Sequence, residues 1–321
     1  MPMIRSMYAY RSFMLLLLLI LTACGSQETE NEQISEDSED TGSSHYPIEV
    51  EDADGNVAQI TREPERIVSL MPSNTEIVFA LDEGDALVGV TDFDDYPEEA
   101  ASIESVGSGM EFDVERVLAL EPDLVLDHAS SGDAADEGLE QLENAGIDVL
   151  TVADPHSLQE AYGVIEDVGT VVNREAEAED IIQGIESEIE DIQQVTNEIP
   201  EEEQKRVWIE VSEDPDLYTT GSDTFMDDML TTVGAKNAAE DSEGWVAYTE
   251  EDAVALDPDV IITTYGDEET IMEREGWQEV TAIQDEAVHR LDEDLLSRPG
   301  PRLTEGLRTL AEHIYEDEWT N

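Results

Sequence analysis

A ten-residue pattern that occurs twice is the feature of this sequence that most constrains its fold. Residues 117–126 read Val-Leu-Ala-Leu-Glu-Pro-Asp-Leu-Val-Leu and residues 253–262 read Ala-Val-Ala-Leu-Asp-Pro-Asp-Val-Ile-Ile, so the two copies are offset by 136 without a gap. Each copy predicts the end of a helix, a proline turn and a short buried strand. A strand–helix unit that repeats in this way is typical of a chain built from two related domains. We therefore predict two related α/β lobes.

Strand–helix alternation fills the rest of both halves. We expect strands at 67–70, 87–90, 124–126, 149–152 and 207–211, and helices at 74–81, 114–120, 139–144 and 302–315. A hairpin that turns at Asp54-Gly55 is expected before the first of these strands. The predicted fold class is thus α/β, with two Rossmann-like lobes.

A long amphipathic segment lies between the two copies of the repeat. The pattern is helical over nearly all of 158–199, where only glycines 163, 169 and 184 are expected to interrupt it. From 176 to 199, isoleucines recur at three- and four-residue spacing on an otherwise acidic segment, which predicts one buried stripe. The expected domains are an N-terminal lobe over 46–170, a connecting helix over 171–200 and a C-terminal lobe over 201–321.

The balance of charges excludes nucleic-acid binding and indicates that the protein works in concentrated salt. The chain has 82 Asp and Glu against 14 Lys and Arg, a formal charge of −68. Such a surface repels phosphate polyanions, so nucleic-acid binding is excluded. The acids are spread over both halves, and lysine occurs only at Lys205 and Lys236. Because the Debye length falls to ~3 Å at about 1 M salt, this repulsion would be screened in brine, and we predict a halophilic protein.

The first 23 residues are predicted to be a signal peptide. Arg5 and Arg11 precede an apolar run over 13–21, which is too short to span a bilayer. Cys24, the single cysteine, follows directly, and this arrangement resembles the bacterial lipoprotein signal, whose cysteine becomes the lipidated first residue. That resemblance implies an acyl anchor such as palmitate on the extracytoplasmic face of the cell membrane. The polar residues that follow Cys24, as far as position 45, are expected to form a flexible tether.

Several motifs, in order along the chain, carry a resemblance to a known family. They are Arg-Ile-Val-Ser-Leu-Met-Pro-Ser-Asn-Thr-Glu-Ile-Val-Phe-Ala-Leu at 66–81, Val-Gly-Val-Thr at 88–91, Asp-Tyr-Pro at 95–97, Leu-Tyr-Thr-Thr-Gly at 217–221, Gly-Trp at 244–245 and Leu-Leu-Ser-Arg-Pro-Gly-Pro-Arg at 295–302. Over about 46–315 the chain resembles the helical-backbone (class III) substrate-binding proteins of ABC importers. Within them it is most similar to the branch that delivers vitamin B12 (cobalamin) and related corrinoids, whose cousins carry ferric siderophores.

This resemblance implies a function and a set of site residues. It implies a monomer with a ligand cleft between two lobes, which delivers its ligand to an ABC permease and ATPase. An acid near the start of one helix in each lobe would dock on the permease, and Glu115 and Glu251 match these positions at the repeat offset. The residues implied for the corrinoid cleft are Phe93, Tyr218, Trp245, Asp294 and Arg298. One departure is Ser-Gly-Met at 108–110, where some corrinoid binders have a further aromatic side chain.

Three alternatives lead to different expectations. A free-metal receptor would need a cluster of histidines and carboxylates, but the five histidines are scattered, so we expect no metal site. An anionic ferric siderophore would need arginines in the cleft, for which Arg298 and Arg302 are the candidates. A secreted enzyme is the most distant alternative, since the sequence has no nucleophile elbow, phosphate loop or His-Glu-x-x-His motif. We expect no cofactor other than the transported ligand.

Overall fold

The computed structural model describes residues 45–53, 55–213 and 216–319, which belong to one compact unit. The predicted signal peptide, Cys24 and nearly all of the predicted tether lie outside the described residues. Within the described residues, no helix combines the length and the apolar character that a bilayer span requires.

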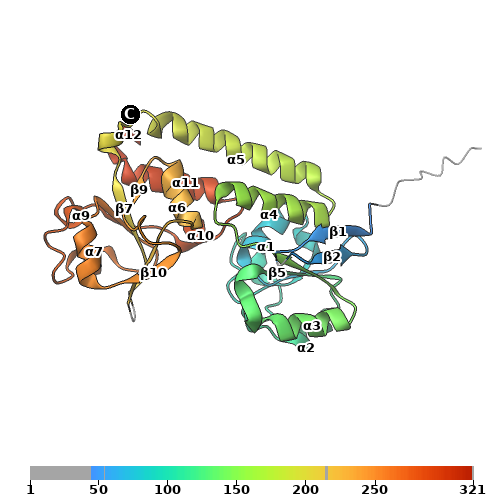
Figure 1. Ribbon diagram of the computed structural model, residues 1–321. Coiled ribbons are helices and arrows are strands. Elements are labelled where there is room, and N and C mark those ends of the chain that lie inside the picture. The colour runs from blue at the N-terminus through green and yellow to red at the C-terminus, as the bar shows by residue number, and fades with distance from the viewer. Residues whose placement is uncertain (1–44, 54, 214–215, 320–321) are drawn as a thin grey trace, which may run out of the picture. The chain divides into compact units, whose positions relative to one another are not determined.

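The N-terminal lobe is built on a four-stranded parallel sheet in the order β4-β3-β5-β6. The predicted hairpin of β1 and β2 pairs antiparallel and packs beside β6. Helices α2 and α3 lie below this sheet and α4 lies above it (Figure 1). The bounds are β1 (Ile48–Glu51), β2 (Val57–Ile60), β3 (Ile67–Ser69), α1 (Pro72–Ala80), η1 (Gly84–Ala86), β4 (Leu87–Gly89), η2 (Ala100–Ser102), α2 (Val114–Ala119), β5 (Leu124–His128), η3 (Ala129–Ala134), α3 (Asp136–Asn144), β6 (Asp148–Val152) and α4 (Leu158–Val171).

The C-terminal lobe contains the same parallel arrangement with an antiparallel addition. Strands β9, β7, β11 and β12 are parallel neighbours in that order, which matches β4, β3, β5 and β6. Strands β8 and β10 extend the sheet in the antiparallel direction. The bounds are α5 (Glu175–Thr196), η4 (Glu201–Glu203), β7 (Arg206–Ser212), β8 (Leu217–Thr220), α6 (Phe225–Thr232), β9 (Lys236–Asn237), β10 (Trp245–Tyr248), α7 (Glu250–Leu256), β11 (Val260–Thr263), α8 (Glu268–Met272), α9 (Thr281–Gln284), β12 (Val288–Arg290), α10 (Glu293–Ser297), α11 (Leu303–Ile314) and α12 (Glu316–Trp319).

The two copies of the repeat adopt the same backbone. Helix α2 and strand β5 correspond to α7 and β11. In each copy, the turn between the helix and the strand contains one residue with a left-handed backbone: Glu121 with φ of 49° and Asp257 with φ of 47°. These two residues are offset by 136. A left-handed conformation is uncommon for a residue with a side chain, so its recurrence in register identifies the lobes as structural repeats.

The same hydrogen bonds brace both copies. The carboxylate of Asp123 accepts from the backbone N–H of Arg66 at 2.9 Å, and that of Asp259 accepts from Arg206 at 2.8 Å. Each arginine side chain in turn donates to a carbonyl oxygen at the end of its helix, at Leu120 and Leu256. Each arginine therefore ties the start of a central strand to the end of the repeated helix.

The predicted long helix is two helices. Helix α4 ends at Val171 and α5 begins at Glu175, with Asn173 between them at φ 57°. The glycines were expected to interrupt the helical pattern, and this was wrong, since all three lie within helices. A Cβ atom at Gly169 would lie 2.7 Å from the Cβ of Ala178, so this glycine lets α4 and α5 approach closely. Helix α5 lies within the segment 171–200 that was predicted to connect the lobes.

Alternating side chains of the central strands build separate cores. Along β5, Leu124 and Leu126 belong to the core shared with α4 and α5, whereas Val125 belongs to a core with α2 and α3. Strand β11 repeats this alternation at an offset of 136. The shared core continues through α11 into the C-terminal lobe. Both sheets are thus covered on two faces, which leaves the ends of the strands to carry a site.

Candidate functional site

The loop after β4 lies at the carboxyl end of the parallel strands of the N-terminal lobe. Thr91 fixes this loop, because its backbone N–H and its hydroxyl both donate to Oδ2 of Asp94, at 2.8 and 2.5 Å. Burial raises the pKa of the Asp94 carboxyl, and the bonds from Thr91 oppose that shift in part. Phe93, between these residues, is left 63% exposed. Since α/β proteins bind ligands at the carboxyl ends of their strands, this aromatic ring lies where a ligand would be bound.

The antiparallel addition of the C-terminal lobe carries the other two predicted aromatics. In the pairing of β8 with β10, Tyr218 lies opposite Ala247 and Thr220 lies opposite Trp245. Side chains lie on the same face of a sheet when two residues are directly opposite on paired strands, or two apart along one strand. Tyr218 is opposite Ala247, which is two residues from Trp245, so Tyr218 and Trp245 share one face of the sheet. Tyr218 is 40% exposed and Trp245 is 55% exposed. All three predicted aromatics are thus outside the cores and free to contact a ligand.

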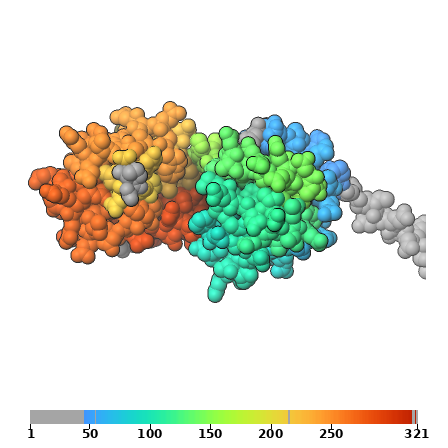
Figure 2. Space-filling model, turned by 90° about the horizontal axis from the view of Figure 1, so that it is seen from below, coloured from blue at the N-terminus to red at the C-terminus, as the bar shows by residue number. Residues whose placement is uncertain are grey.

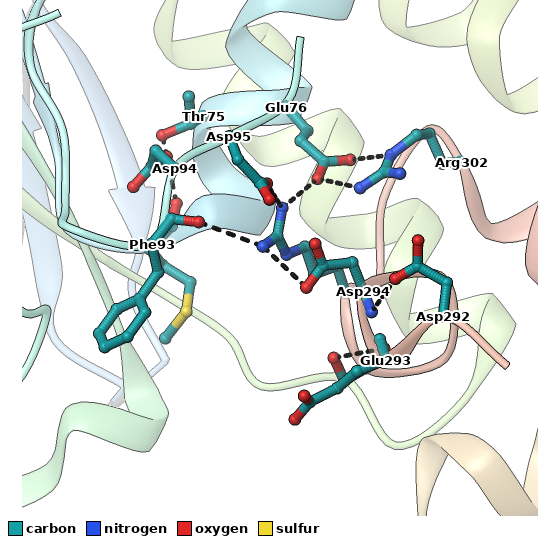
Figure 3. A network of polar contacts seen from close by, with 12 residues as sticks. Thr75, Glu76, Phe93, Asp94, Asp95, Asp292, Glu293, Asp294 and Arg302 are labelled. Carbon is teal, nitrogen blue, oxygen red and sulfur yellow. Dashed lines mark hydrogen bonds and ion pairs between the residues drawn. The ribbon is translucent and has the colours of Figure 1, made fainter. Parts of the chain in front are cut away.

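Arg298, directly after α10, links the two lobes. Its Nη1 donates to Oε1 of Glu76 at 3.0 Å and to Oδ1 of Asp95 at 2.9 Å. Its Nη2 donates to the carbonyl oxygen of Phe93 at 3.2 Å and lies 2.8 Å from Oδ1 of Asp294. Figure 3 labels Glu76, Phe93, Asp95 and Asp294, the four residues whose contacts converge here. Burial lowers the pKa of Arg298, but the hydrogen bonds that it donates to Glu76 and Asp95 outweigh this effect, so that its pKa is raised and the guanidinium stays charged.

Arg302 binds the same buried carboxylate. Its Nε donates to Oε2 of Glu76 at 2.8 Å and its Nη2 donates to Oε1 at 2.6 Å, an arrangement with two parallel bonds. Its Cζ also lies 4.0 Å from the ring centroid of Tyr96, in a cation–π contact. Both arginines that were candidates for an anionic siderophore are therefore already bound to protein carboxylates.

The charges around these arginines sum to a negative value. Two guanidinium groups face three carboxylates, those of Glu76, Asp95 and Asp294, which leaves one formal negative charge. Burial raises the pKa of Asp294, Arg298 opposes this shift, and the neighbouring Asp95 adds to it. This net negative charge repels a polyanionic ligand, whereas a neutral or cationic ligand is not repelled.

A cavity of about 190 Å³ opens beside these residues. From the C-terminal lobe it is lined by Trp245 and by Leu296, Ser297 and Pro299, which flank Arg298. From the loop between β6 and α4 it is lined by residues 154–156. Figure 2, viewed from below Figure 1, shows the orange and teal lobes meeting with red residues between them. Small-ligand pockets usually enclose roughly 300–1,000 Å³, so this cavity would be one part of a wider cleft.

A larger cavity of about 620 Å³ lies away from the aromatics. It is lined by residues that precede β7, β11 and β12, such as Lys205, Asp259 and Ala287. These positions are the amino ends of parallel strands, opposite the ends that usually carry a site. We therefore place the candidate site at the smaller cavity.

Glu115 and Glu251 both lie exposed in the first turn of a helix, in α2 and α7. The caps of these helices are made by other side chains. Asp113 accepts from the backbone N–H of Arg116, and Thr249 accepts from that of Asp252. Within the described part of the chain, neither glutamate has a hydrogen-bond or ion-pair partner. Capping therefore does not explain the pair, and their docking role stays a prediction.

Of the predicted site residues, the structure brings Phe93, Asp294 and Arg298 into direct contact. Trp245 lines the adjoining cavity. Tyr218 lies on the same sheet face as Trp245 through the pairing of β8 with β10. Sequence reasoning gave no role to Glu76, although an acid within the apolar helix 74–81 is a signal that could have drawn attention to it.

For metals, the described residues contain no cluster of three or more His, Cys, Asp or Glu side chains that could hold an ion.

Two lobes that share a parallel sheet topology, are joined by helices and each carry exposed aromatic side chains define a two-lobed ligand-binding protein. The chain belongs to the periplasmic binding protein family, whose pattern matches residues 67–295.

Three known proteins are similar to this chain over most of its length. The ABC transporter substrate-binding lipoprotein YvrC of Bacillus subtilis, itself described as uncharacterized, is 45% identical over 305 residues, 95% of this chain and 96% of that protein. The vitamin B12-binding protein of Pectobacterium carotovorum is 30% identical over 241 residues, 75% of this chain and 84% of that protein. The crystal structure of a Staphylococcus epidermidis protein, described as a possible iron-binding (periplasmic solute-binding) protein, matches with a TM-score of 0.71 at 34% identity, covering 79% of this chain and all of that one.

Proposed function

We propose that this protein is the extracytoplasmic substrate-binding component of an ABC importer and that its ligand is cobalamin or a related corrinoid. The observation that carries the ligand proposal is the cleft chemistry: exposed aromatic rings on both lobes stand beside arginines that carboxylates have neutralised. A large ring fringed with neutral amides needs apolar faces and a few polar groups, and it needs no excess of cations. The similarity to a vitamin B12-binding protein supports the same choice.

The test is a titration followed by tryptophan fluorescence in molar salt. Trp245 is half-exposed, whereas Trp208 and Trp277 are fully buried, so a ligand in the cleft should quench mainly Trp245. We expect micromolar cyanocobalamin to quench the wild-type protein and to have much less effect on Trp245→Phe. Unchanged fluorescence together with no heat of binding would remove the corrinoid proposal.

A ferric complex is the second candidate ligand, and the segment 108–110 favours it. A Cβ atom at Gly109 would lie 2.2 Å from the carbonyl oxygen of Leu70, so no aromatic side chain fits there. Met110 is 57% exposed and offers a flexible apolar surface in its place. The similarity to a structure described as a possible iron-binding protein points the same way. A neutral ferric hydroxamate is the form that the negative cleft would accept.

The remaining parts of the proposal concern the protein's partners and its cellular location. Glu115 and Glu251 would dock on the permease, and the ATPase would drive transfer. Lipidation of Cys24, with an acyl chain such as palmitate, would hold a monomer on the outer face of the cell membrane, in a salt-rich medium. The similarity to a protein named as a lipoprotein over 95% of this chain supports the anchor. The protein would bind and deliver its ligand without catalysing a reaction.

A further inference from the structure

Glu76 is a buried carboxylate that joins segments far apart in the sequence. It lies in α1, is only 3% exposed, and is followed by the buried apolar residues Ile77 and Val78. Its partners Arg298 and Arg302 lie 222 and 226 residues further along the chain. Figure 3 shows both oxygen atoms of Glu76 directed at the guanidinium group of Arg302. An acid in such a position is stable only because it is paired.

The other two carboxylates of this cluster are less able to neutralise the arginines. The side chain of Asp95 is 67% exposed and that of Asp294 is 28% exposed, compared with 2% for Glu76. Water and salt screen an exposed charge far more than a buried one. Glu76 is also the only one of the three that binds Arg302 in the described contacts. Each carboxylate carries one formal charge, but the charge of Glu76 is the least screened, so it opposes the two arginines most strongly.

We propose that Glu76 is a specificity-determining residue that sets the charge of the ligand the cleft accepts. It keeps Arg298 and Arg302 from serving as an anion site and thereby excludes polyanionic ligands. It acts through the two arginines, without touching the ligand. The inference rests on the proposed function in assuming that the ligand lies at this cleft, but it does not depend on the ligand being a corrinoid.

Glu76→Gln tests this directly, because it removes the charge and keeps the shape of the side chain. Glu83→Gln is the matched control: Glu83 follows the same helix, forms an ion pair with Arg174 outside the cleft and is 20% exposed. The probes are two iron complexes, a ferric tricatecholate, which is a trianion, and a ferric trihydroxamate, which is neutral. Dissociation constants are measured by fluorescence at one fixed salt concentration that maintains the fold.

We expect Glu76→Gln to bind the tricatecholate roughly ten- to a hundredfold more tightly than the wild type does, as one unscreened charge a few ångströms away would cause. The trihydroxamate should change less than threefold, and Glu83→Gln should change neither. An equal gain for both complexes would mean that the substitution only loosens the cleft, and would overturn the inference. So would a gain in the control variant, or no gain for the trianion.

A second variant covers the case in which Glu76→Gln does not fold, as judged by circular dichroism. Asp95→Asn removes an exposed charge from Arg298, so folding should survive, and we expect a gain of a few-fold for the tricatecholate alone. A gain in that variant as large as the one expected for Glu76→Gln would refute the inference, and so would tighter binding of the tricatecholate than of the trihydroxamate by the wild-type protein, in which Glu76 opposes both arginines. Cyanocobalamin is titrated in parallel, since failure of the wild type to bind it would remove the corrinoid proposal while the comparison of the two iron complexes still reports on Glu76.

Discussion

The two lobes share one half of their architecture and differ in the other. Strands β4, β3, β5 and β6 have the same order and direction as β9, β7, β11 and β12, and the turn at Glu121 recurs at Asp257. The antiparallel pair β8 and β10 is an addition to the C-terminal sheet. It carries Tyr218 and Trp245, whereas the N-terminal lobe presents Phe93 from a loop.

This difference separates two tasks. The repeated helices α2 and α7 carry the exposed pair Glu115 and Glu251, which an importer with two similar subunits could recognise in the same way. The unrepeated parts carry the exposed aromatic side chains that are the candidate ligand contacts. We infer that the duplicated framework serves delivery and that the unmatched loops and strands serve ligand choice.

The largest expected effect comes from breaking the symmetric pair. The double variant Glu115→Arg, Glu251→Arg should abolish uptake in cells, because it reverses both charges offered to the permease. Ligand affinity should stay within twofold, since the repeated helices do not line the candidate cavity. The control is Glu137→Arg with Glu269→Arg, which also lie in the first turns of helices, α3 and α8, and carry the same dipole cost of about 0.3–1 kcal/mol each. Uptake that persists in the first variant would contradict the division of tasks.

Two tryptophans of the C-terminal lobe should respond in opposite ways. Trp277 is fully buried and Trp245 is 55% exposed. We expect Trp277→Ala to lower the free energy of unfolding by about 3–5 kcal/mol, as large cavities in cores do. Trp245→Ala should leave Tm within about 2 °C of the wild type and weaken ligand binding at least tenfold. Thermal melts and titrations of the two variants, done side by side, would show whether strand β10, which carries Trp245, serves binding while the core around Trp277 serves stability.

Low salt should destabilise both lobes together. Repulsion among the 82 acids is screened in molar salt and restored in dilute buffer. We expect Tm to fall by roughly 10 °C or more on dilution, given that 1 kcal/mol shifts Tm by about 2–4 °C in a chain of this size. The melt should stay a single transition, because one core runs through both lobes. A Tm that does not depend on salt would argue against a halophilic protein.

The smallest expected effect concerns a buried acid of the N-terminal sheet. Asp127, at the end of β5, is 2% exposed, and burial raises the pKa of its carboxyl above the ordinary value of 3.8. As pH falls, Asp127 therefore binds a proton at a higher pH in the native state than in the unfolded chain. At neutral pH the buried charged carboxylate lowers the free energy of unfolding, and this loss disappears as the group becomes protonated. Asp127→Asn keeps the oxygen that accepts from Ser131. It should raise Tm at pH 7 by an amount that shrinks on acidification, whereas the exposed Asp133→Asn should show no such trend.

Local patterns predicted those parts of the fold that local interactions determine. The strand at 67–70 and the final helix were confirmed because their apolar periodicity follows directly from burial on one or two faces. The break at Asn173 was missed, because the helical pattern runs on across a single left-handed residue. Strands β8 and β10 lacked a distinctive alternation and entered only through the family resemblance.

The candidate site was predicted in its exposed parts and missed in its buried part. The aromatic residues could be placed from motifs, and their exposure was then visible in the structure. The role of Glu76 depends on partners more than 200 residues away, which no pattern within α1 can reveal. Likewise, the sequence marked Arg298 as a ligand contact but gave no sign that four protein groups already surround it.

The brace that Arg66 and Arg206 form in the two lobes has a consequence for how such proteins can change. Each brace is complete within its own lobe, tying a central strand to the helix that bears Glu115 or Glu251. The segments that carry the candidate ligand contacts can therefore be exchanged between relatives without disturbing the helices that bear Glu115 and Glu251. Grafting the loop 91–97 together with the strand residues 217–220 and 245–248 from a homologue is accordingly a practical route to test whether these segments set what the protein binds.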